Sequence, residues 1–399
     1  MTPMTTTTHT RLAAAADLHV AMRGGIALSV GAAHGRLRTV RNRTVVTLRE
    51  TVEEAQAAVM PCGSASSRVV PEPDSSYRDE NPQPPTVTPP IAADPSEHRV
   101  QRSPLQSAFT HLAINSLEPR TRTICRELLE RFSDRNTCDG AVDYAQEIPA
   151  RVMAHMLGIS EDSCDLFRQW IHDFMEVGMT DPGTVTRVIT DMTAYLAKEI
   201  AKRRASPRSD LISCLLDARM EGQALTDDHI IGTLRPLLIA GVDTTWSAIG
   251  SCLWHLATHA DDRRRLVAEP QLIPPAVEEF LRAYAPATMA REVIAETEIN
   301  GCRFKVGEMV MLAFAAANHD HAVFPDADRV MMDRAENRQA AFGPGIHRRI
   351  GSDLARMAIR VALEEWLKQI PEFSLAPEAV VGWSTGTVRG PRRLPFVLG

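Results

Sequence analysis

One short loop near the end of the sequence combines residues suited to holding a large ligand: AAFGPGIHRRIG, residues 340–351. Gly343 and Gly345 permit positive φ and a close approach of the backbone to a bound group. His347 supplies an imidazole, two arginines follow it, and Gly351 precedes the apolar periodic run LARMAIRVALEEWL. The pattern predicts a tightly turned loop that opens into a helix.

A second candidate site lies in LLIAGVDTTWSAIG, where Gly241, Asp243 and Thr244 interrupt a long apolar helix. A glycine beside a threonine can open the backbone ladder of a helix and leave a groove for a small ligand, and a neighbouring carboxylate can supply protons. The alternative is that Asp243 caps a new helix that begins at TTWSAIG. Taken alone, these residues leave both interpretations open.

Two further spacings place charged groups on one helical face. Glu279 and Arg282 are three residues apart, so they can form a charge-assisted pair that is buried if their apolar neighbours belong to the core. Most such pairs are solvated and contribute little to stability. His98 and Arg102, four residues apart in DPSEHRVQR, suit an anionic group such as a cofactor carboxylate, although a solvated basic face is the commoner explanation.

Composition limits the class of protein. With 399 residues, 44% hydrophobic and 24% charged, the chain can bury a large core. A net charge of -6 gives no indication of a nucleic-acid or anionic-membrane partner. Seven cysteines without a C-x-x-C pair indicate reduced, buried thiols rather than a disulfide framework or a zinc site. No run of apolar residues is long enough to span a membrane, so we expect a cytoplasmic protein.

The elements that must position these residues are mostly helical. Residues 1–33 form a poorly defined N-terminal segment, 34–60 predict two short strands and a helix, and 61–95 hold nine of the 26 prolines and predict a long loop. Asn300-Gly301 predicts a hairpin turn, and the tail after residue 370 predicts strands and turns. Helices are predicted at 96–114, 117–133, 143–157, 160–176, 183–203, 208–218, 227–258, 261–267, 274–284 and 351–368.

In this order, the H-x-x-x-R helix, the A-G-x-D-T-T helix, the E-x-x-R helix and the F-G-x-G-x-H loop resemble the cytochrome P-450 haem-thiolate monooxygenases, over roughly residues 34–399. The resemblance implies a mainly α fold with a small β portion, a helical triangular prism with sheets at one side, as a single domain. The sequence DTTWS and the VRGPRRLP strand are most similar to those of the bacterial class that often carries a fused reductase. This chain ends at Gly399 without one, so electrons are expected from a separate ferredoxin or flavodoxin-type system, and the substrate is expected to be a small apolar organic molecule.

The resemblance also implies roles for individual residues. Thr244 would help deliver protons to iron-bound dioxygen, with Asp243 as its acidic neighbour. Glu279 and Arg282 would form a structural pair, with Arg334 or Arg338 as a third member. The haem-binding residues implied by the resemblance are Ala240 and Gly241 in the groove, His98, Arg102, Arg291 and His347 at the propionates, and Phe342, Gly343, Gly345 and Gly351 in the loop.

One position departs from the family pattern in a way that bears on chemistry. The loop F-G-x-G-x-H-x-C-x-G places Arg349 where the family has its axial cysteine. The thiolate binds iron and favours O–O cleavage, whereas arginine has no acceptor lone pair and is not deprotonated in proteins. The sequence therefore predicts no metal ligand at this position and weak or absent haem binding in the thiolate mode.

Lesser departures are His319 and His321, which replace the arginine and proline of an N-R-D-P turn, and Pro104 and Pro236, which fall inside predicted helices. Two functions remain open. One is a monooxygenase that uses haem and dioxygen, with activity in doubt because of Arg349. The other is a haem-free protein of the same fold that acts as a binding or auxiliary partner.

Overall fold

The computed structural model describes residues 88–399, apart from 92, 94, 133, 294–295, 300–301, 307 and 385–386, together with four strands of the preceding part. These strands are β1 (Ile26–Val30), β2 (Arg38–Val40), β3 (Arg43–Leu48) and β4 (Ala65–Ser66). The two strands expected within 34–60 are thus present, and the helix expected after them lies outside the described residues. β1 falls within residues 1–33, where the sequence analysis expected no regular element.

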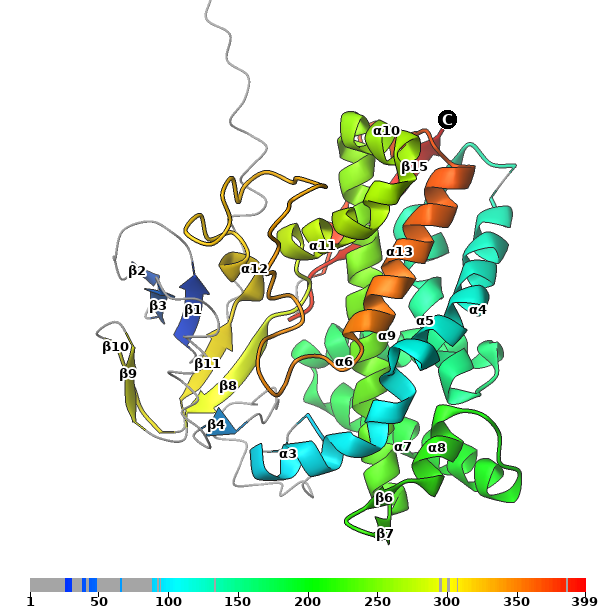
Figure 1. Ribbon diagram of the computed structural model, residues 1–399, viewed down its shortest axis with the longest axis vertical. Coiled ribbons are helices and arrows are strands. Elements are labelled where there is room, and N and C mark those ends of the chain that lie inside the picture. Colours follow the sequence, from blue (N-terminus) through cyan, green and yellow to red (C-terminus); the bar gives the residue numbers. More distant parts are fainter. Residues whose placement is uncertain are drawn as a thin grey trace, which may run out of the picture.

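Helices dominate the rest of the chain. They are α3 (Pro95–Arg102), α4 (His111–Glu130), α5 (Glu147–Leu157), α6 (Cys164–Met175), α7 (Pro182–Ala205), α8 (Leu211–Asp217), α9 (Asp227–Thr258), α10 (Ala260–Ala268), α11 (Ile273–Ala283), α12 (Phe314–Ala317) and α13 (Ser352–Gln369). α9 runs through the centre of the helical part, and α13 packs against both α9 and α4 (Figure 1). The mainly α fold with a small β portion is confirmed.

The long helix α9 has the bounds that the sequence predicts, 227–258. Thr226 caps it, since its side chain accepts a hydrogen bond from the backbone N–H of His229 at 3.2 Å. Pro236 lies inside the helix and does not shift its start. Among the described residues, α9 is the one helix long and apolar enough to cross a membrane, and 67% of its apolar window is buried inside the protein.

The helix predicted at 96–114 is wrong in one respect, because the structure divides it. α3 ends at Arg102, a 3₁₀ turn covers Ser103–Phe109, and α4 begins at His111, where Thr110 caps it. Pro104 explains the break, since it has no N–H for the helical ladder. The segment predicted at 117–133 is therefore the continuation of α4. Irregular turns also precede α5 and α6, a π turn at Gly140–Ala145 and a 3₁₀ turn at Glu161–Ser163.

The β portion gathers at one side of the helices (Figure 1). The largest sheet has the order β2-β3-β1-β11-β8-β4, in which β8 is Met289–Val293 and β11 is Met309–Leu312. β4 lies in the proline-rich stretch and pairs only with β8, so it forms an edge strand. The strands predicted on either side of Asn300-Gly301 pair antiparallel, as β9 (Thr297–Ile299) and β10 (Cys302–Phe304). The two turn residues themselves lie outside the described residues.

The C-terminal tail forms strands, as predicted. These are β12 (Phe373–Leu375), β13 (Gly382–Trp383), β14 (Pro391–Arg393) and β15 (Pro395–Leu398). β15 lies between β12 and β5 (Thr137–Asp139), and β13 pairs with β14. A short hairpin joins α8 to α9 through β6 (Arg219–Met220) and β7 (Gln223–Ala224). The tail strand β14 also contacts α9, which brings the end of the chain to the centre of the molecule.

The core between α13 and the tail is aromatic. Trp366 is fully buried, and its ring lies 5.0 Å from Tyr144, 5.3 Å from Phe373 and 5.8 Å from Phe396, measured between centroids. The hydroxyl of Tyr144 donates a hydrogen bond to the backbone carbonyl of Ala362 at 2.8 Å, so this buried polar group is satisfied. Trp366 therefore connects α13 to the π turn and to the strands β12 and β15.

We expect Trp366→Ala to lower the free energy of unfolding by roughly 3–5 kcal/mol, because it leaves a cavity among three aromatic rings. Urea unfolding followed by circular dichroism measures this. Leu112→Ala is a matched control, since Leu112 is 83% exposed, and should change stability by no more than about 0.5 kcal/mol. Similar losses for the two variants would contradict the assignment of Trp366 to the core.

Candidate active site

The segment of α9 that carries Asp243 and Thr244 is a continuous part of the helix. The hydroxyl of Thr244 donates to the carbonyl of Ala240, one turn earlier, at 2.6 Å. The alternative in which Asp243 caps a new helix is wrong, because α9 passes through this position without interruption. Gly241 lies against α5: a Cβ there would come within 3.2 Å of the sulfur of Met153.

The carboxyl of Asp243 is 1% exposed and is held by a residue from the tail. Its Oδ1 accepts a hydrogen bond from Nη2 of Arg392 in β14 at 2.7 Å. Oδ2 has no hydrogen-bond partner among the described residues. Burial raises the pKa of Asp243 to about 6, although the charge of Arg392 opposes this. The group can therefore hold a proton near neutral pH.

Arg392 contacts three further residues besides Asp243. It forms an ion pair with Glu176, at the end of α6, and donates to the hydroxyl of Ser247 at 2.9 Å. Its guanidinium also lies over the ring of Trp246, 4.3 Å from the centroid. The sequence analysis missed Arg392 and Glu176 as site residues. The VRGPRRLP strand could be recognised in the sequence. No local pattern, however, indicates that its Arg392 contacts Asp243, which lies 149 residues earlier on α9.

The loop of residues 340–351 has the backbone that its glycines predict. Gly343 and Gly345 adopt φ of +71° and +72°, the left-handed region that favours glycine. The backbone N–H of Arg349 donates to the carbonyl of Phe342 at 2.9 Å, which closes the loop on itself. Gly351 occupies the position directly before the first residue of α13.

The side chain of Arg349 crosses from this loop to α9. Its Nη1 donates to Oγ1 of Thr244 at 3.2 Å and lies 3.5 Å from the carbonyl oxygen of Ala240. Burial lowers the pKa of Arg349, and the nearby carboxylate of Asp243 opposes that shift. The space left between loop and helix is a cavity of about 20 Å³, whose lining includes Thr244, Ala248, Leu281, Phe342, Arg349 and Ile359.

Four basic residues converge beside the loop, from α3, β8 and the loop itself. We call His98, Arg102, Arg291 and His347 the basic cluster. The rings of His98 and His347 meet edge to face at 4.4 Å, and Arg102 donates to the carbonyl of Ile346 at 3.2 Å. Burial and the charges of Arg291, His98 and Arg102 lower the pKa of His347 to about 3. Burial and the charge of Arg102 also lower the pKa of His98.

Glu279 and Arg282 form a fully buried ion pair on α11, both 0% exposed. Arg282 donates two hydrogen bonds of 2.8 Å to the two carboxylate oxygens, a bidentate contact. Arg334 adds a third at 2.9 Å, whereas Arg338 is exposed and no contact places it at the pair. Burial alone would raise the pKa of Glu279, but these hydrogen bonds outweigh it and the pKa is lowered.

Arg282 also fixes the segment that leads to the loop. It donates to the backbone carbonyls of Asn318, Ala327 and Arg329, each within 2.9 Å. The side chain of Asn318 in turn accepts from the N–H of Ala340, the first residue of the loop, at 2.8 Å. His319, in place of the family arginine, bonds the carbonyl of Ala315 through Nδ1 at 2.8 Å. The turn therefore keeps its asparagine contact despite the two histidines.

Two parts of the site differ in how well they suit haem, the cofactor that the resemblance implies. The basic cluster suits carboxylates, because Nε of Arg291 and Nε2 of His347 are buried without a hydrogen-bond partner among the described residues. The ligand position does not suit iron, because Arg349 has no lone pair to offer. The 20 Å³ cavity is also far below the roughly 300–1,000 Å³ of small-molecule sites. In this arrangement the site does not fit haem in the thiolate mode.

Among the residues that the structure describes, no other metal ligand set takes the place of the thiolate. Within the described part of the chain, no three His, Cys, Asp or Glu residues group as a metal site. The cysteines whose side chains the structure describes are free thiols, and none belongs to the loop: Cys125, Cys138, Cys164, Cys214 and Cys252. Burial raises the pKa of Cys125 to about 12, so that thiol stays protonated.

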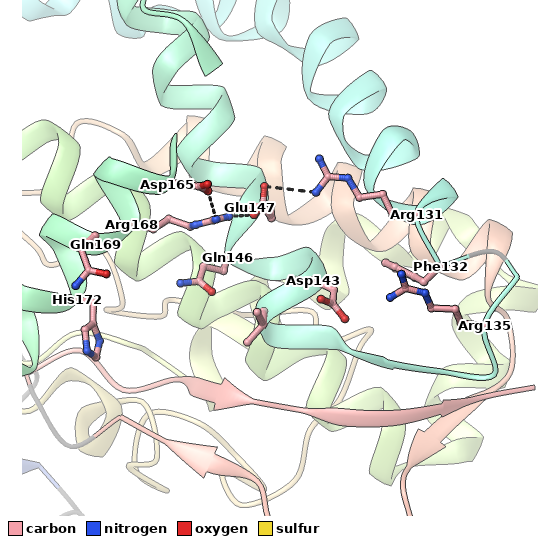
Figure 2. Close-up of a pocket in the computed structure, with 11 residues that line it drawn as sticks. Arg131, Phe132, Arg135, Asp143, Gln146, Glu147, Asp165, Arg168, Gln169 and His172 are labelled. Carbon is pink, nitrogen blue, oxygen red and sulfur yellow. Dashed lines mark hydrogen bonds and ion pairs between the residues drawn. The ribbon is translucent and has the colours of Figure 1, made fainter. Parts of the chain in front are cut away.

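A larger cavity of about 550 Å³ lies elsewhere, between the end of α4, the start of α5 and α6. Figure 2 shows Arg168 placed between Asp165 and Glu147, with Arg131 directed at the same Glu147. Three arginines and three acidic residues line it, so its charges balance. None of the residues singled out from the sequence lines this cavity.

Comparison with known proteins gives a consistent result. The family model described as Cytochrome P450 matches residues 151–379. The chain is 34% identical to a mycinamicin IV hydroxylase/epoxidase of Micromonospora griseorubida, over 77% of this chain and 79% of that protein. It is 33% identical to a steroid C26-monooxygenase of Mycolicibacterium smegmatis, over 77% of this chain and 78% of that protein.

Solved structures show the same similarity. A mutant of P450 EryK in complex with erythromycin B superposes with a TM-score of 0.79 at 30% identity, covering 88% of this chain and 90% of that one. The cytochrome P450 PksS of Bacillus subtilis 168 superposes with a TM-score of 0.74 at 30% identity, covering 77% and 81%.

Removing the third member of the buried ion pair should destabilise the fold. In Arg334→Ala, Glu279 loses one charged hydrogen bond and the backbone carbonyls of Pro325 and Asp326 lose the guanidinium that donates to them, so we expect a loss of roughly 2–3 kcal/mol. Arg338→Ala is the matched control and should stay within about 0.5 kcal/mol. Chemical unfolding measures the loss of stability in both variants. A larger loss in Arg338→Ala would mean that Arg338, and not Arg334, is the third member of the ion pair.

Asp243 gives a prediction about pH. Its pKa rises from 3.8 to about 6 on folding, so between these values the folded protein holds a proton that the unfolded chain has released. Stability contributed by this group is therefore lost as pH rises through that window, by at most about 3 kcal/mol. In Asp243→Asn the free energy of unfolding should fall less steeply from pH 4 to 7 than in the unsubstituted protein.

The control for this measurement is Asp261→Asn, because Asp261 has a 97% exposed side chain. Its curve against pH should run parallel to that of the unsubstituted protein. If the Asp243→Asn curve does the same, Asp243 is not the buried titrating group.

Proposed function

Because the chain belongs to the cytochrome P450 family, whose members bind haem and work with redox partner proteins, we propose that it is built as a monooxygenase whose turnover Arg349 impairs or abolishes. The reaction of that fold is the dioxygen-dependent hydroxylation or oxidation of a small organic substrate. Haem supplies the oxidising chemistry where it is bound.

The observation that carries the proposal is the contact between Arg349 and Thr244. The acid and the alcohol of the oxygen-activation helix are both present, Asp243 buried with a raised pKa and Thr244 beside it. The guanidinium of Arg349 occupies a hydrogen bond to that same hydroxyl, 3.2 Å away. One residue thus removes the axial thiolate and also binds the alcohol of the proton-delivery pair.

The other site residues keep the roles that the family resemblance implies. Asp243 would hold a proton at its carboxyl, and Thr244 would hold one at Oγ1. The basic cluster would bind the haem propionates, with Ala240, Gly241, Phe342, Gly343, Gly345 and Gly351 shaping the two sides of the haem site. Glu279 and Arg282 serve as the structural pair.

Substrate, partners and location follow from the same premise. Two relatives are named for a hydroxylation of mycinamicin IV and for an oxidation of steroids at C26, which supports a small, largely apolar organic substrate. Electrons would come from a separate ferredoxin or flavodoxin-type system. The burial of α9 supports a cytoplasmic protein. Residues 34–399 would form the single domain, with the proline-rich 61–95 as its loop.

A second function has one observation in its favour. Because Arg349 bridges the loop to α9, the described part of the chain closes its haem site without a cofactor. A haem-free protein of this fold that binds a partner or assists another enzyme would need no thiolate.

An absorption spectrum distinguishes these functions. The protein is expressed with haem precursor, purified, reduced under carbon monoxide, and compared with Arg349→Cys. We expect little or no haem and no red-shifted thiolate band in the natural protein, and both haem and that band in the variant, because a thiolate would then face the iron.

Arg348→Cys is the matched control, since it puts a thiol one residue away in the same loop, at an exposed position. It should not produce the band. A thiolate band in the natural protein would mean that another cysteine reaches the iron and that our reading of Arg349 is wrong. If Arg349→Cys takes up no haem either, the haem-free function is favoured.

A further inference from the structure

The cavity of about 550 Å³ between the end of α4, the start of α5 and α6 shares no lining residue with the haem site (Figure 2). Its volume lies within the roughly 300–1,000 Å³ of small-molecule sites. The floor is buried or partly buried at Phe132, Glu147 and Arg168, and the rim is exposed at Arg131, Arg135 and Gln169. A small molecule can therefore enter this cavity from solvent.

One carboxylate on the floor is shared by three arginines. Glu147 contacts Arg168 and accepts a hydrogen bond from Nε of Arg151 at 3.2 Å, and Nη1 of Arg131 lies 3.9 Å from it. Asp165 also contacts Arg168, but its side chain is 86% exposed. Burial lowers the pKa of Arg168, and the charge of Arg131 lowers it further. The positive charge of Arg131 is therefore only partly compensated inside the cavity.

A second guanidinium is available on the turn that follows α4. The side chain of Arg135 has no hydrogen bond or ion pair within the described part of the chain. The third acid of the lining, Asp143, accepts from the backbone N–H of Asp139 through Oδ2 at 2.8 Å. Figure 2 shows Arg131 and Arg135 on the same side of the cavity. The charges of the lining balance in number, yet two arginines at one end can still bind an anion.

The rest of the lining offers apolar surface and uncharged hydrogen-bonding groups. Phe132 and the 46% exposed Val142 supply the apolar surface. The amide of Gln146 has no hydrogen-bond partner among the described residues, and Gln169 donates through Nε2 to Asp173 at 2.7 Å, which leaves its Oε1 as an acceptor. The lining therefore suits a partly apolar, uncharged body that carries an anionic group.

We propose that this cavity is a binding site for a small organic acid, whose carboxylate lies between Arg131 and Arg135 and whose body lies over Phe132 and Val142. The planar fork of a guanidinium matches the two oxygens of a carboxylate. The site uses no residue of the haem site. It is therefore an additional binding site whichever of the two functions proposed above holds.

The test is thermal unfolding of the purified full chain as 4-hydroxybenzoate is added at constant ionic strength, with sodium chloride as the balancing salt. We expect a saturable rise in melting temperature, because a ligand that binds only the folded state stabilises it. Uncharged 4-hydroxybenzamide should produce no such rise over the same concentrations. Arg131→Gln and Arg135→Gln should each raise the half-saturating concentration of the acid about tenfold. Both side chains are exposed, so we expect both variants to fold.

Two further variants serve as controls. Arg264→Gln removes a surface arginine on α10 whose side chain is 62% exposed, and it should bind the acid as the unsubstituted protein does. Arg102→Gln removes a guanidinium of the basic cluster and should also leave binding of the acid unchanged. The second control separates the cavity from the residues assigned to the haem carboxylates.

Three results would overturn the inference. Without saturable stabilisation by 4-hydroxybenzoate, the cavity is not a site for a small acid. Equal stabilisation by the amide would mean that the carboxylate is not recognised. Binding lost in Arg102→Gln but kept in Arg135→Gln would place the acid at the basic cluster. None of these results depends on whether Arg349→Cys gains a thiolate band, so the two proposals fail separately.

Discussion

The buried pair between Glu279 and Arg282 is the contact on which the rest of the site depends. Two full charges stand at zero exposure, and each is tolerated only because the other and a shell of backbone groups satisfy it. Arg282 holds three carbonyls of the segment after α12, and Glu279 accepts from the N–H of Met331 and from Arg334. That segment has no strand or helix of its own. Its path to the loop at 340 is therefore set by these charges rather than by regular structure.

Much of this arrangement could be predicted from sequence because its signals are local. The bounds of α9, the pairing of β9 with β10 and the glycine conformations of the loop all arise from neighbouring residues, and the structure has them. The break after α3 also has a local cause, since Pro104 lacks the N–H that a continuous helix needs. The apolar periodicity on both sides of Pro104 nevertheless favoured one continuous helix.

Contacts between distant segments could not be predicted in the same way. Asp243 alone permitted either a cap of a new helix or a position inside a continuous one. The uninterrupted α9 decides for the second, and the arginine that contacts the acid, Arg392, comes from another part of the chain. Arg338 and Arg334 were equal candidates for the ion pair, because they lie four positions apart in irregular backbone and their sequence carries no periodicity. Arg349 was identifiable as a departure from the family pattern, but its reach to Thr244 required the fold.

The contact of Asp243 with Arg392 also affects the order in which the chain can pack during its synthesis. The acid is translated 149 residues before the arginine that neutralises it. During synthesis α9 emerges with a carboxyl that is costly to bury and has no guanidinium beside it, while α6 and the Glu176 that follows it, the other acid that Arg392 contacts, are already complete. The centre of the protein can therefore reach its final packing only when β14 arrives. Because the last strands are translated at the end, their docking completes the core.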